Sequence, residues 1–367
     1  MKIVIDARIR RASTGRPVDR LLEHLQKLDN ENKYTVLLES DDDWKPTAKN
    51  FRAVPCRFKQ FSMNPLNQLL FARQLNKLNA DLVHFTLTGT QPLLYFGRQI
   101  TMTHDLTMFK HVRKKRGMPR WLHWLRMKGY RLLVWSAHRR AEHIIVPTQY
   151  VRDAVAKLHL FTNRKITVAY EAGDPPLDIK AQKPENFTAS PYLLYVGSAF
   201  PHKNLRRLVM AYEQIKLAHP TLKLILVGKQ ERFAKQLQRW VKKRGSKDVE
   251  FAGFVTDGEL KWLYQNASLY VFPSLSEGFG LPGLEAMAHG CPVASSSATC
   301  LPEVYGDSAH YFDPEDVDDM AQKINEMLGK ESLRKQLIEA GHKQVKKYSW
   351  ERFTQQNLDV YKQVLGG

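Results

Sequence analysis

Short apolar runs alternate with amphipathic stretches along most of the chain. In the first half, the apolar runs predict strands at residues 2–6, 34–38, 81–85, 100–103, 144–147 and 166–169. Helical periodicity lies between them, for example over residues 18–28 and 65–78. Several runs are apolar on consecutive residues, which is typical of strands buried on both faces of a parallel sheet. The alternation of strand and helix therefore predicts an α/β, doubly wound fold.

The alternation is interrupted over residues 173–190, where prolines and charges replace the periodicity. A second set of strands is then predicted at residues 192–196, 222–227, 249–251, 269–272, 292–294 and 309–312, and helical patterns close the chain at 317–328, 332–347 and 350–364. We expect a Rossmann-like domain over residues 1–172, a linker over 173–190, a second Rossmann-like domain over 191–349, and a C-terminal helix over 350–367. The sequence does not decide whether this last helix crosses back to the first domain. Ligands of such sheets bind beyond the carboxyl ends of the strands, so we expect the two domains to face a central cleft that holds the site.

Composition narrows the class of protein. The 367 residues suffice for two domains with cores of their own. The 56 Lys and Arg exceed the 37 Asp and Glu, and the net charge of +19 favours an anionic partner such as nucleotide phosphates, nucleic acid or acidic lipid. The three cysteines show no metal-ligand spacing, which argues against a disulfide framework. Since no apolar run reaches the ~18–20 residues of a membrane span, we expect a cytoplasmic protein that can attach peripherally to the inner face of the cell membrane.

The most informative segment runs from residue 269 to residue 290. A predicted strand ends near Pro273, a glycine-rich loop follows, and a helix is expected to begin near Pro282. Backbone amides at a helix N-terminus attract anions. Gly278 and Gly280 leave room for a phosphate to approach the backbone. This order of elements predicts a phosphate-binding loop.

Two acids flank the loop. Glu277 lies at its start, and Glu285, eight residues later, is expected in the first turn of the helix. Taken singly, Glu277 is explained as a solvated loop residue and Glu285 as an acid that complements the helix dipole. Both acids around one glycine-rich loop favour a binding site.

Two other motifs compete with this interpretation. Residues 278–283 match G-x-G-x-x-G, and Glu303 lies twenty residues beyond Gly283, as a dinucleotide-binding oxidoreductase would require. However, four residues separate the predicted strand and Pro273 from the first glycine, which disfavours that class. The run Asp41-Asp42-Asp43 follows a predicted strand and could bind a metal, but acids in this position are most often turn or cap residues. We therefore predict no metal site.

Several segments in the same order resemble the retaining glycosyltransferases of family 4, the group 1 glycosyltransferases with the GT-B fold. The segment from Glu277 to Glu285 looks like the E-x7-E motif of that family. Further resemblances lie at Gly15-Arg16 in the first turn, at 103–106 (Thr-His-Asp-Leu), at 146–148, at 195–205 around His202-Lys203-Asn204, and at 251–255. Together they extend over nearly the whole chain.

The resemblance implies roles for individual residues. His104 and Glu277 would contact the transferred sugar and are the catalytic candidates. Lys203 would neutralise the donor diphosphate, and Glu285 would bind the ribose hydroxyls. The donor-binding set implied is Gly15, Ser198, Lys203, Phe254, Val255, Phe279, Gly280, Leu281 and Glu285. Many family members carry an arginine where this chain has Ser198 or His202. The resemblance therefore does not say which group of this chain makes that contact to the diphosphate.

The same resemblance implies a mechanism and a donor. Front-face transfer with retention would be driven by stabilising the departing nucleoside diphosphate, with no cofactor and no metal. The segment His202-Lys203-Asn204 favours GDP-mannose, with a UDP-hexose as the second option. The acceptor would be a glycan or a lipid-linked sugar. A GT-B enzyme that binds a nucleotide sugar without transferring it, and a basic membrane- or nucleic-acid-binding protein, are the alternatives.

A basic and aromatic stretch extends from Lys110 to Arg140. It carries ten Lys or Arg from 113 onwards, interleaved with Trp121, Trp124, Tyr130 and Trp135. A helix here would lie in a bilayer interface, or it would pack its tryptophans on the first domain and expose its cations. Nucleic-acid binding would use the same residues, but no recognisable nucleic-acid module accompanies them, so we predict no nucleic-acid partner.

Overall fold

In a computed structural model of the chain, two compact units are built from residues 1–171 with 350–367, and from residues 172–349. The structure describes residues 1–12, 14–110, 118–173, 179–185, 187 and 191–366, without the side chain of residue 110. Half of the predicted linker, residues 174–178, 186 and 188–190, therefore lies outside the described residues.

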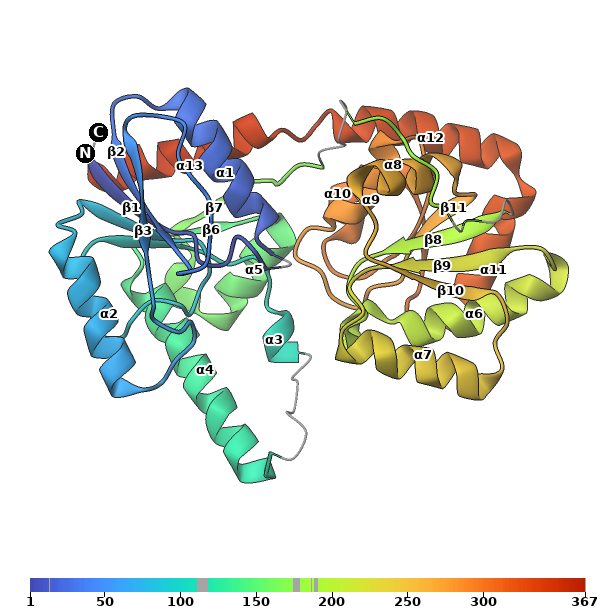
Figure 1. Cartoon of the computed structure of the whole chain (residues 1–367), viewed down its shortest axis with the longest axis horizontal. Helices are drawn as coiled ribbons and strands as arrows, with labels where there is room; N and C mark the ends of the chain where they lie inside the picture. The colour runs from blue at the N-terminus through green and yellow to red at the C-terminus, as the bar shows by residue number, and fades with distance from the viewer. Residues whose placement is uncertain (13, 111–117, 174–178, 186, 188–190, 367) are drawn as a thin grey trace. The chain divides into compact units, whose positions relative to one another are not determined.

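The first unit contains a seven-stranded sheet in the order β3-β2-β1-β4-β5-β6-β7, with every neighbouring pair parallel. Helices α1 and α13 lie on one face of this sheet, and α2 and α4 on the other (Figure 1). The strands are β1 (Lys2–Asp6), β2 (Lys33–Leu38), β3 (Phe51–Pro55), β4 (Leu82–Phe85), β5 (Gln99–Met102), β6 (His143–Val146) and β7 (Ile166–Val168). The helices are α1 (Arg16–Leu28), α2 (Pro65–Lys77), α3 (Thr107–Lys110), α4 (Arg120–Arg140), α5 (Gln149–Leu158) and α13 (Trp350–Leu365), with a 3-10 turn η1 at Leu160–Thr162.

The second unit contains a six-stranded parallel sheet in the order β10-β9-β8-β11-β12-β13. Helices α6 and α7 cover one face, and α8 and α9 the other (Figure 1). The strands are β8 (Tyr192–Val196), β9 (Lys223–Val227), β10 (Val249–Gly253), β11 (Leu269–Phe272), β12 (Val293–Ser296) and β13 (Ala309–Phe312). The helices are α6 (Leu205–Ala218), α7 (Arg232–Arg244), α8 (Asp257–Asn266), α9 (Leu281–Ala288), α10 (Leu301–Tyr305), α11 (Val317–Gly329) and α12 (Glu331–Val345), with 3-10 turns η2 at Pro201–Lys203 and η3 at Gly306–Ser308.

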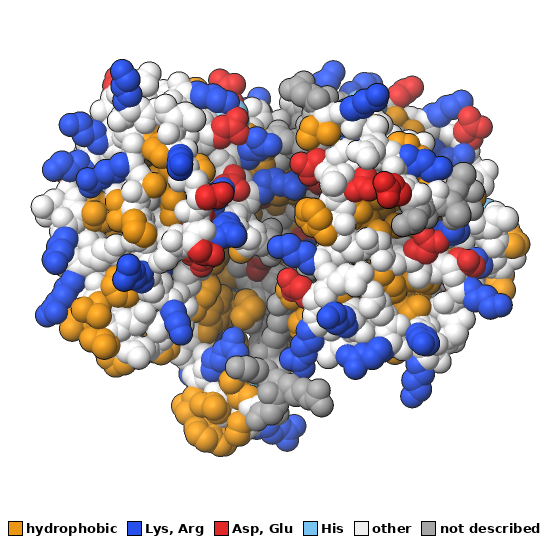
Figure 2. All heavy atoms as spheres, in the orientation of Figure 1, with side chains coloured by type: hydrophobic (Ala, Val, Ile, Leu, Met, Phe, Trp, Pro, Cys, Tyr) orange, Lys and Arg blue, Asp and Glu red, His pale blue; other side chains and the backbone are white. Residues whose placement is uncertain are grey.

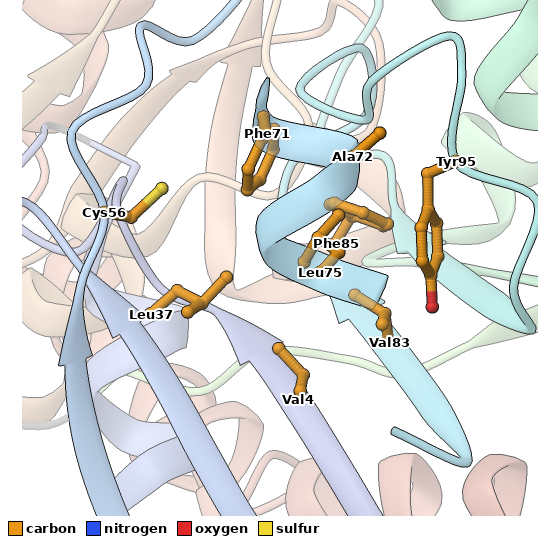
Figure 3. Close-up of a cluster of buried hydrophobic side chains, with 9 residues drawn as sticks. All are labelled: Val4, Leu37, Cys56, Phe71, Ala72, Leu75, Val83, Phe85 and Tyr95. Atoms are coloured by element: carbon orange, nitrogen blue, oxygen red, sulfur yellow. The ribbon is translucent and has the colours of Figure 1, made fainter. Parts of the chain in front are cut away.

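Both sheets are doubly wound, as predicted, and the apolar runs form their central strands. All residues of β4 and β11 are buried. In the first unit, Phe71, Ala72 and Leu75 of α2 pack on the sheet side chains of the core shown in Figure 3. Strand β3 was not predicted, because three of its five side chains are exposed and Pro55 ends it at the edge of the sheet.

Helix α13 belongs to the first unit, although it is last in sequence. Its Tyr361 hydroxyl lies 2.7 Å from Nδ1 of His84 on β4, and both side chains are buried. Gln356 also donates to the carbonyl of Val168 at the end of β7. Burial lowers the pKa of His84 to about 3, so the imidazole in this contact is neutral.

Candidate active site

In each sheet, the candidate residues follow the carboxyl ends of the strands. In the second unit, β8 and β11 are neighbours at the centre of the sheet, and the chain leaves them toward opposite sides of the strand order. Such a point is where open parallel sheets bind their ligands. Ser198 and Lys203 follow β8, and Glu277 follows β11.

Asn204 holds the two loops together. It is buried in the left-handed conformation, with a φ of 61°, between the turn η2 and helix α6. Its side-chain amide donates to the carbonyls of Pro273, at 3.1 Å, and Pro314, at 2.6 Å. The amide of Leu275 donates to the carbonyl of His202 at 2.8 Å. These bonds fix the residue before Asn204 beside the loop that follows β11.

That preceding residue, Lys203, forms an ion pair with Glu277. Lys203 Nζ lies 2.6 Å from Glu277 Oε1, and the two side chains are 17% and 13% exposed. Nζ also lies 5.7 Å from the centre of the Phe272 ring. The lysine assigned to the diphosphate and the acid assigned to the sugar are thus bonded to each other. An anion that reaches Lys203 would compete with this carboxylate.

Gly280 caps helix α9 with a φ of 103°. A Cβ at this position would lie 2.6 Å from the Tyr305 hydroxyl, and one at Gly283 would lie 2.3 Å from the same atom. The Tyr305 hydroxyl donates to the carbonyl of Gly280 at 2.5 Å. Two glycines of the G-x-G-x-x-G match are therefore explained by packing on Tyr305, independently of any ligand.

The helix begins one residue earlier than predicted, since Leu281 is its first residue and Pro282 its second. This start places Glu285 in the second turn, which corrects the prediction that it lies in the first. Glu285 is 6% exposed, and its Oε2 accepts a hydrogen bond from the Tyr264 hydroxyl at 3.4 Å. The prediction missed Tyr264, which lies on α8 and has no motif around it.

Phe279 and Phe254, both assigned to the donor, lie in opposite environments. The Phe279 side chain is 4% exposed and packs edge-on against Tyr348, at 5.5 Å between ring centres, so its side chain belongs to the core. Phe254 directly follows β10 and is 81% exposed, with Val255 beside it half-buried. Strand β10 lies two strands from β8 in the sheet, so the carboxyl ends of these two strands are about 10 Å apart.

In the first unit, His104 follows β5 and both of its ring nitrogens have partners. Nε2 donates to the carbonyl of Thr86 at 2.9 Å, and Nδ1 lies 3.3 Å from Glu171 Oε1. Burial opposes the charged ring, but the hydrogen bond and the charge of Glu171 outweigh it and raise the pKa of His104. Glu171, which follows β7 and is 5% exposed, was missed by the sequence analysis because no motif marks it.

The first βα turn of this unit is closely packed. Gly15 precedes helix α1, and a Cβ there would lie 1.8 Å from the carbonyl oxygen of Arg10. Arg10 pairs with Asp19 and Asp42, and Arg11 lies 3.0 Å from Asp41. Two of the three acids considered as metal ligands are thus ion-pair partners of arginines in this turn.

The chain is similar in sequence to known glycosyltransferases. The family model described as "Glycosyltransferase Family 4" matches residues 15–175, and the one described as "Glycosyl transferases group 1" matches residues 178–344. The chain is 40% identical over 177 residues to the O-antigen chain mannosyltransferase B of Escherichia coli, covering 47% of this chain and 45% of that protein. It is 34% identical over 188 residues to an O-antigen chain mannosyltransferase of Salmonella typhimurium, covering 51% of each. The matches thus span about half the length of these curated relatives.

A solved structure of sucrose-phosphate synthase from Thermosynechococcus elongatus superposes with a TM-score of 0.78 over 100% of this chain and 99% of that one, at 19% identity. At that identity, the superposition supports the fold alone. The family is shown by the two family models, which together cover residues 15–175 and 178–344. The chain therefore belongs to the group 1, family 4 type of glycosyltransferases with the GT-B fold.

Proposed function

We propose that this chain is a retaining hexosyltransferase that transfers mannose from GDP-mannose to a glycan or a lipid-linked sugar, with a UDP-hexose as the alternative donor. The Lys203–Glu277 pair between the loops after β8 and β11 is the observation that carries the proposal. The mannosyl group is supported by the O-antigen mannosyltransferase relatives. The three cysteines are buried free thiols, in keeping with a cytoplasmic place of action.

In the proposed mechanism, the donor diphosphate takes Glu277's place on Lys203. The charge that develops on the departing diphosphate is stabilised by Lys203 and by the amides at the start of α9, where the helix dipole favours an anion. Glu277, released from the lysine, accepts from hydroxyls of the sugar. Glu285, oriented by Tyr264, accepts from the ribose hydroxyls. The scheme needs no metal and no cofactor.

The proposed function is tested by nucleotide release. With GDP-mannose and a lipid-linked or glycan acceptor, we expect GDP release and a glycosylated product whose anomeric configuration is that of the donor. A panel of UDP-hexoses tests the alternative donor. Activity is expected to persist in EDTA, because side-chain cations and the helix dipole stabilise the leaving group. Loss in EDTA with recovery in Mg²⁺ or Mn²⁺ would contradict the metal-independent mechanism, and binding without product would favour a non-transferring enzyme.

A second prediction concerns Lys203. Lys203→Ala removes a charge-assisted contact to the diphosphate, and we expect the dissociation constant of the nucleoside diphosphate to rise by an amount worth about 1.5–3 kcal/mol. The substitution also leaves the nearly buried Glu277 carboxylate without its cation. The double variant Lys203→Ala with Glu277→Gln removes this unpaired charge, so it shows how much of the lost nucleotide affinity is due to the missing lysine alone. Lys216→Ala, which breaks the Lys216–Asp248 ion pair near the C-terminal end of α6, is the matched control. Unchanged affinity in calorimetry would exclude Lys203 from the phosphate site.

A third prediction distinguishes the two acids. Glu277→Gln removes the carboxylate that competes for Lys203, so nucleoside diphosphate affinity should be retained or increased while turnover falls. Glu285→Gln should weaken binding of the free nucleotide, because a ribose acceptor is lost. Calorimetric dissociation constants and turnover are measured for both. Equal effects, or effects in the opposite order, would refute the assigned roles.

A fourth prediction concerns pH and the positioning residue Glu171. The pKa of His104 is raised, so its ring stays charged to a higher pH than an ordinary histidine. The charge is lost as the pH rises through this raised pKa. If the charge assists transfer, activity should fall at the alkaline side. Glu171→Gln removes the largest of the interactions that raise the pKa of His104, so the opposing effect of burial weighs more, the pKa falls, and the alkaline limb should move to lower pH. Glu142→Gln, which removes an exposed partner of Arg98, is the control. A pH–rate profile that stays in place in Glu171→Gln would exclude this role.

A further inference from the structure

The exposed apolar side chains are distributed unequally between the two units. Among the described residues, the second unit exposes three large hydrophobic side chains: Ile179, Leu217 and Phe254. The first unit exposes many more, and most of these lie on α4, on α2 and in the segments before α2 and β5. Contiguous exposed apolar surface on a folded protein marks an interaction site.

Helix α4 exposes apolar residues over its first two turns. Trp121 is 64% exposed, Trp124 is 58% exposed and Leu125 is 48% exposed, at the i, i+3 and i+4 positions of one stripe. Lys128 continues the stripe, with Nζ 5.3 Å from the centre of the Trp124 ring. The alternative in which these two tryptophans pack on the first domain therefore does not hold. Farther along α4, Leu133, Val134 and Ala137 are buried and attach the helix to its unit.

Helix α2 carries a second stripe with the same spacing. Leu66 is 62% exposed, and Leu69 and Leu70 are 37% and 38% exposed, while Phe71 and Leu75 face the core. The segment before α2 joins the two helices. Phe61 lies 5.9 Å from Tyr130 of α4, measured between ring centres, and a Cβ on Gly129 would lie 3.5 Å from the Met63 side chain. Figure 2 shows apolar side chains at the tip of α4 with Lys and Arg beside them, and a further group over α2.

The charge of the chain is concentrated in the same two regions of sequence. Residues 44–80 contain seven Lys or Arg and residues 106–141 contain eleven, and neither segment contains an Asp or Glu. Together they account for +18 of the net charge of +19, although they make up about a fifth of the chain. Arg73, Arg126 and Lys128 are among the exposed cations. The run Arg113–Arg116, part of the basic stretch from Lys110 to Arg140, lies outside the described residues.

We infer that the exposed faces of α2 and α4, with the Phe61–Met63 segment between them, form one surface that docks the first unit on an anionic lipid bilayer. Tryptophan and leucine side chains would enter the headgroup region, and Lys and Arg would neutralise acidic headgroups. A second copy of the chain fits this surface poorly, because pairing two such faces would bring like charges together. The inference concerns a partner surface and stands independently of the proposed transfer reaction.

The inference is tested with the full chain by co-sedimentation with phosphatidylcholine vesicles that contain 30% phosphatidylglycerol, and with neutral vesicles as the reference. The wild-type chain should bind the anionic vesicles and be released by salt, because the attraction is screened within about 8–10 Å at physiological ionic strength. Tryptophan fluorescence should shift to shorter wavelength on binding. A wild-type chain that stays in the supernatant at low salt would overturn the inference.

Variants separate the two helices and the two kinds of contact. Trp121→Gln with Trp124→Gln should weaken binding and remove the fluorescence shift, and Leu66→Gln with Leu70→Gln should weaken binding through α2 alone. Arg126→Gln with Lys128→Gln should raise the vesicle dissociation constant about 25-fold, at roughly fivefold for each cation. All replace exposed side chains, so thermal midpoints and nucleoside diphosphate affinity should be unchanged.

Matched controls come from the second unit. Leu217→Gln removes an 86% exposed leucine from α6, and Lys235→Gln with Arg239→Gln removes two exposed cations from α7. Vesicle binding that falls equally in these controls would show that net charge, rather than the α2–α4 surface, causes attachment, and would overturn the inference. The inference would also be overturned if the chain formed a dimer in solution that dissociated in Trp121→Gln with Trp124→Gln. Binding of single-stranded RNA as tight as binding of the vesicles, at equal salt, would overturn it as well.

Discussion

Parallel pairing of neighbouring strands in both sheets is the constraint on which the remaining structure depends. In a parallel sheet all carboxyl ends lie at one edge, and each crossover helix begins there. His104 follows β5, Glu171 follows β7, Lys203 follows β8, Phe254 follows β10 and Glu277 follows β11. Residues far apart in sequence are therefore collected at one edge of each sheet before any side chain interacts. The Lys203–Glu277 pair, 74 residues apart, is one product of this arrangement.

Buried polar contacts hold the loops after β8 and β11 together at this edge. Both carbonyls that accept hydrogen bonds from the Asn204 side-chain amide belong to buried residues. An unsatisfied buried carbonyl costs about 1–3 kcal/mol, so exchanging Asn204 for an apolar residue would loosen two loops at once. In the glycine-rich loop after β11, Tyr305 fills the space beside Gly280 and Gly283. The position of Lys203 is therefore set by residues that need not contact a ligand.

Elements with a local sequence signal can be predicted from the sequence, whereas those that depend on tertiary partners cannot. The consecutive apolar runs gave the central strands correctly, because burial on both faces requires such runs. Strand β3 lacks the run, since it is an edge strand with exposed side chains. Glu171 and Tyr264 are single residues with no motif, and their importance lies in the partners His104 and Glu285 that folding brings to them. Phe279 was assigned to the donor because it lies inside the motif, whereas its side chain fills the core beside Tyr348.

The glycine-rich motif illustrates how a pattern and its cause can differ. The position of the G-x-G-x-x-G match, four residues beyond Pro273, disfavours a dinucleotide site, and packing explains two of its glycines. A positive φ at Gly280 turns the chain into α9, and a Tyr305 hydroxyl close to both glycines excludes any side chain there. Packing of this kind would be required whether the loop bound a dinucleotide, a sugar nucleotide or nothing. The acids and the lysine distinguish these cases, because a carboxylate held by Lys203 at 2.6 Å must give way before a diphosphate can use the same cation. The strength of that internal pair therefore sets a lower limit on what the donor's phosphates must contribute, and it couples the affinity for the nucleotide to the freedom of the acid assigned to the sugar.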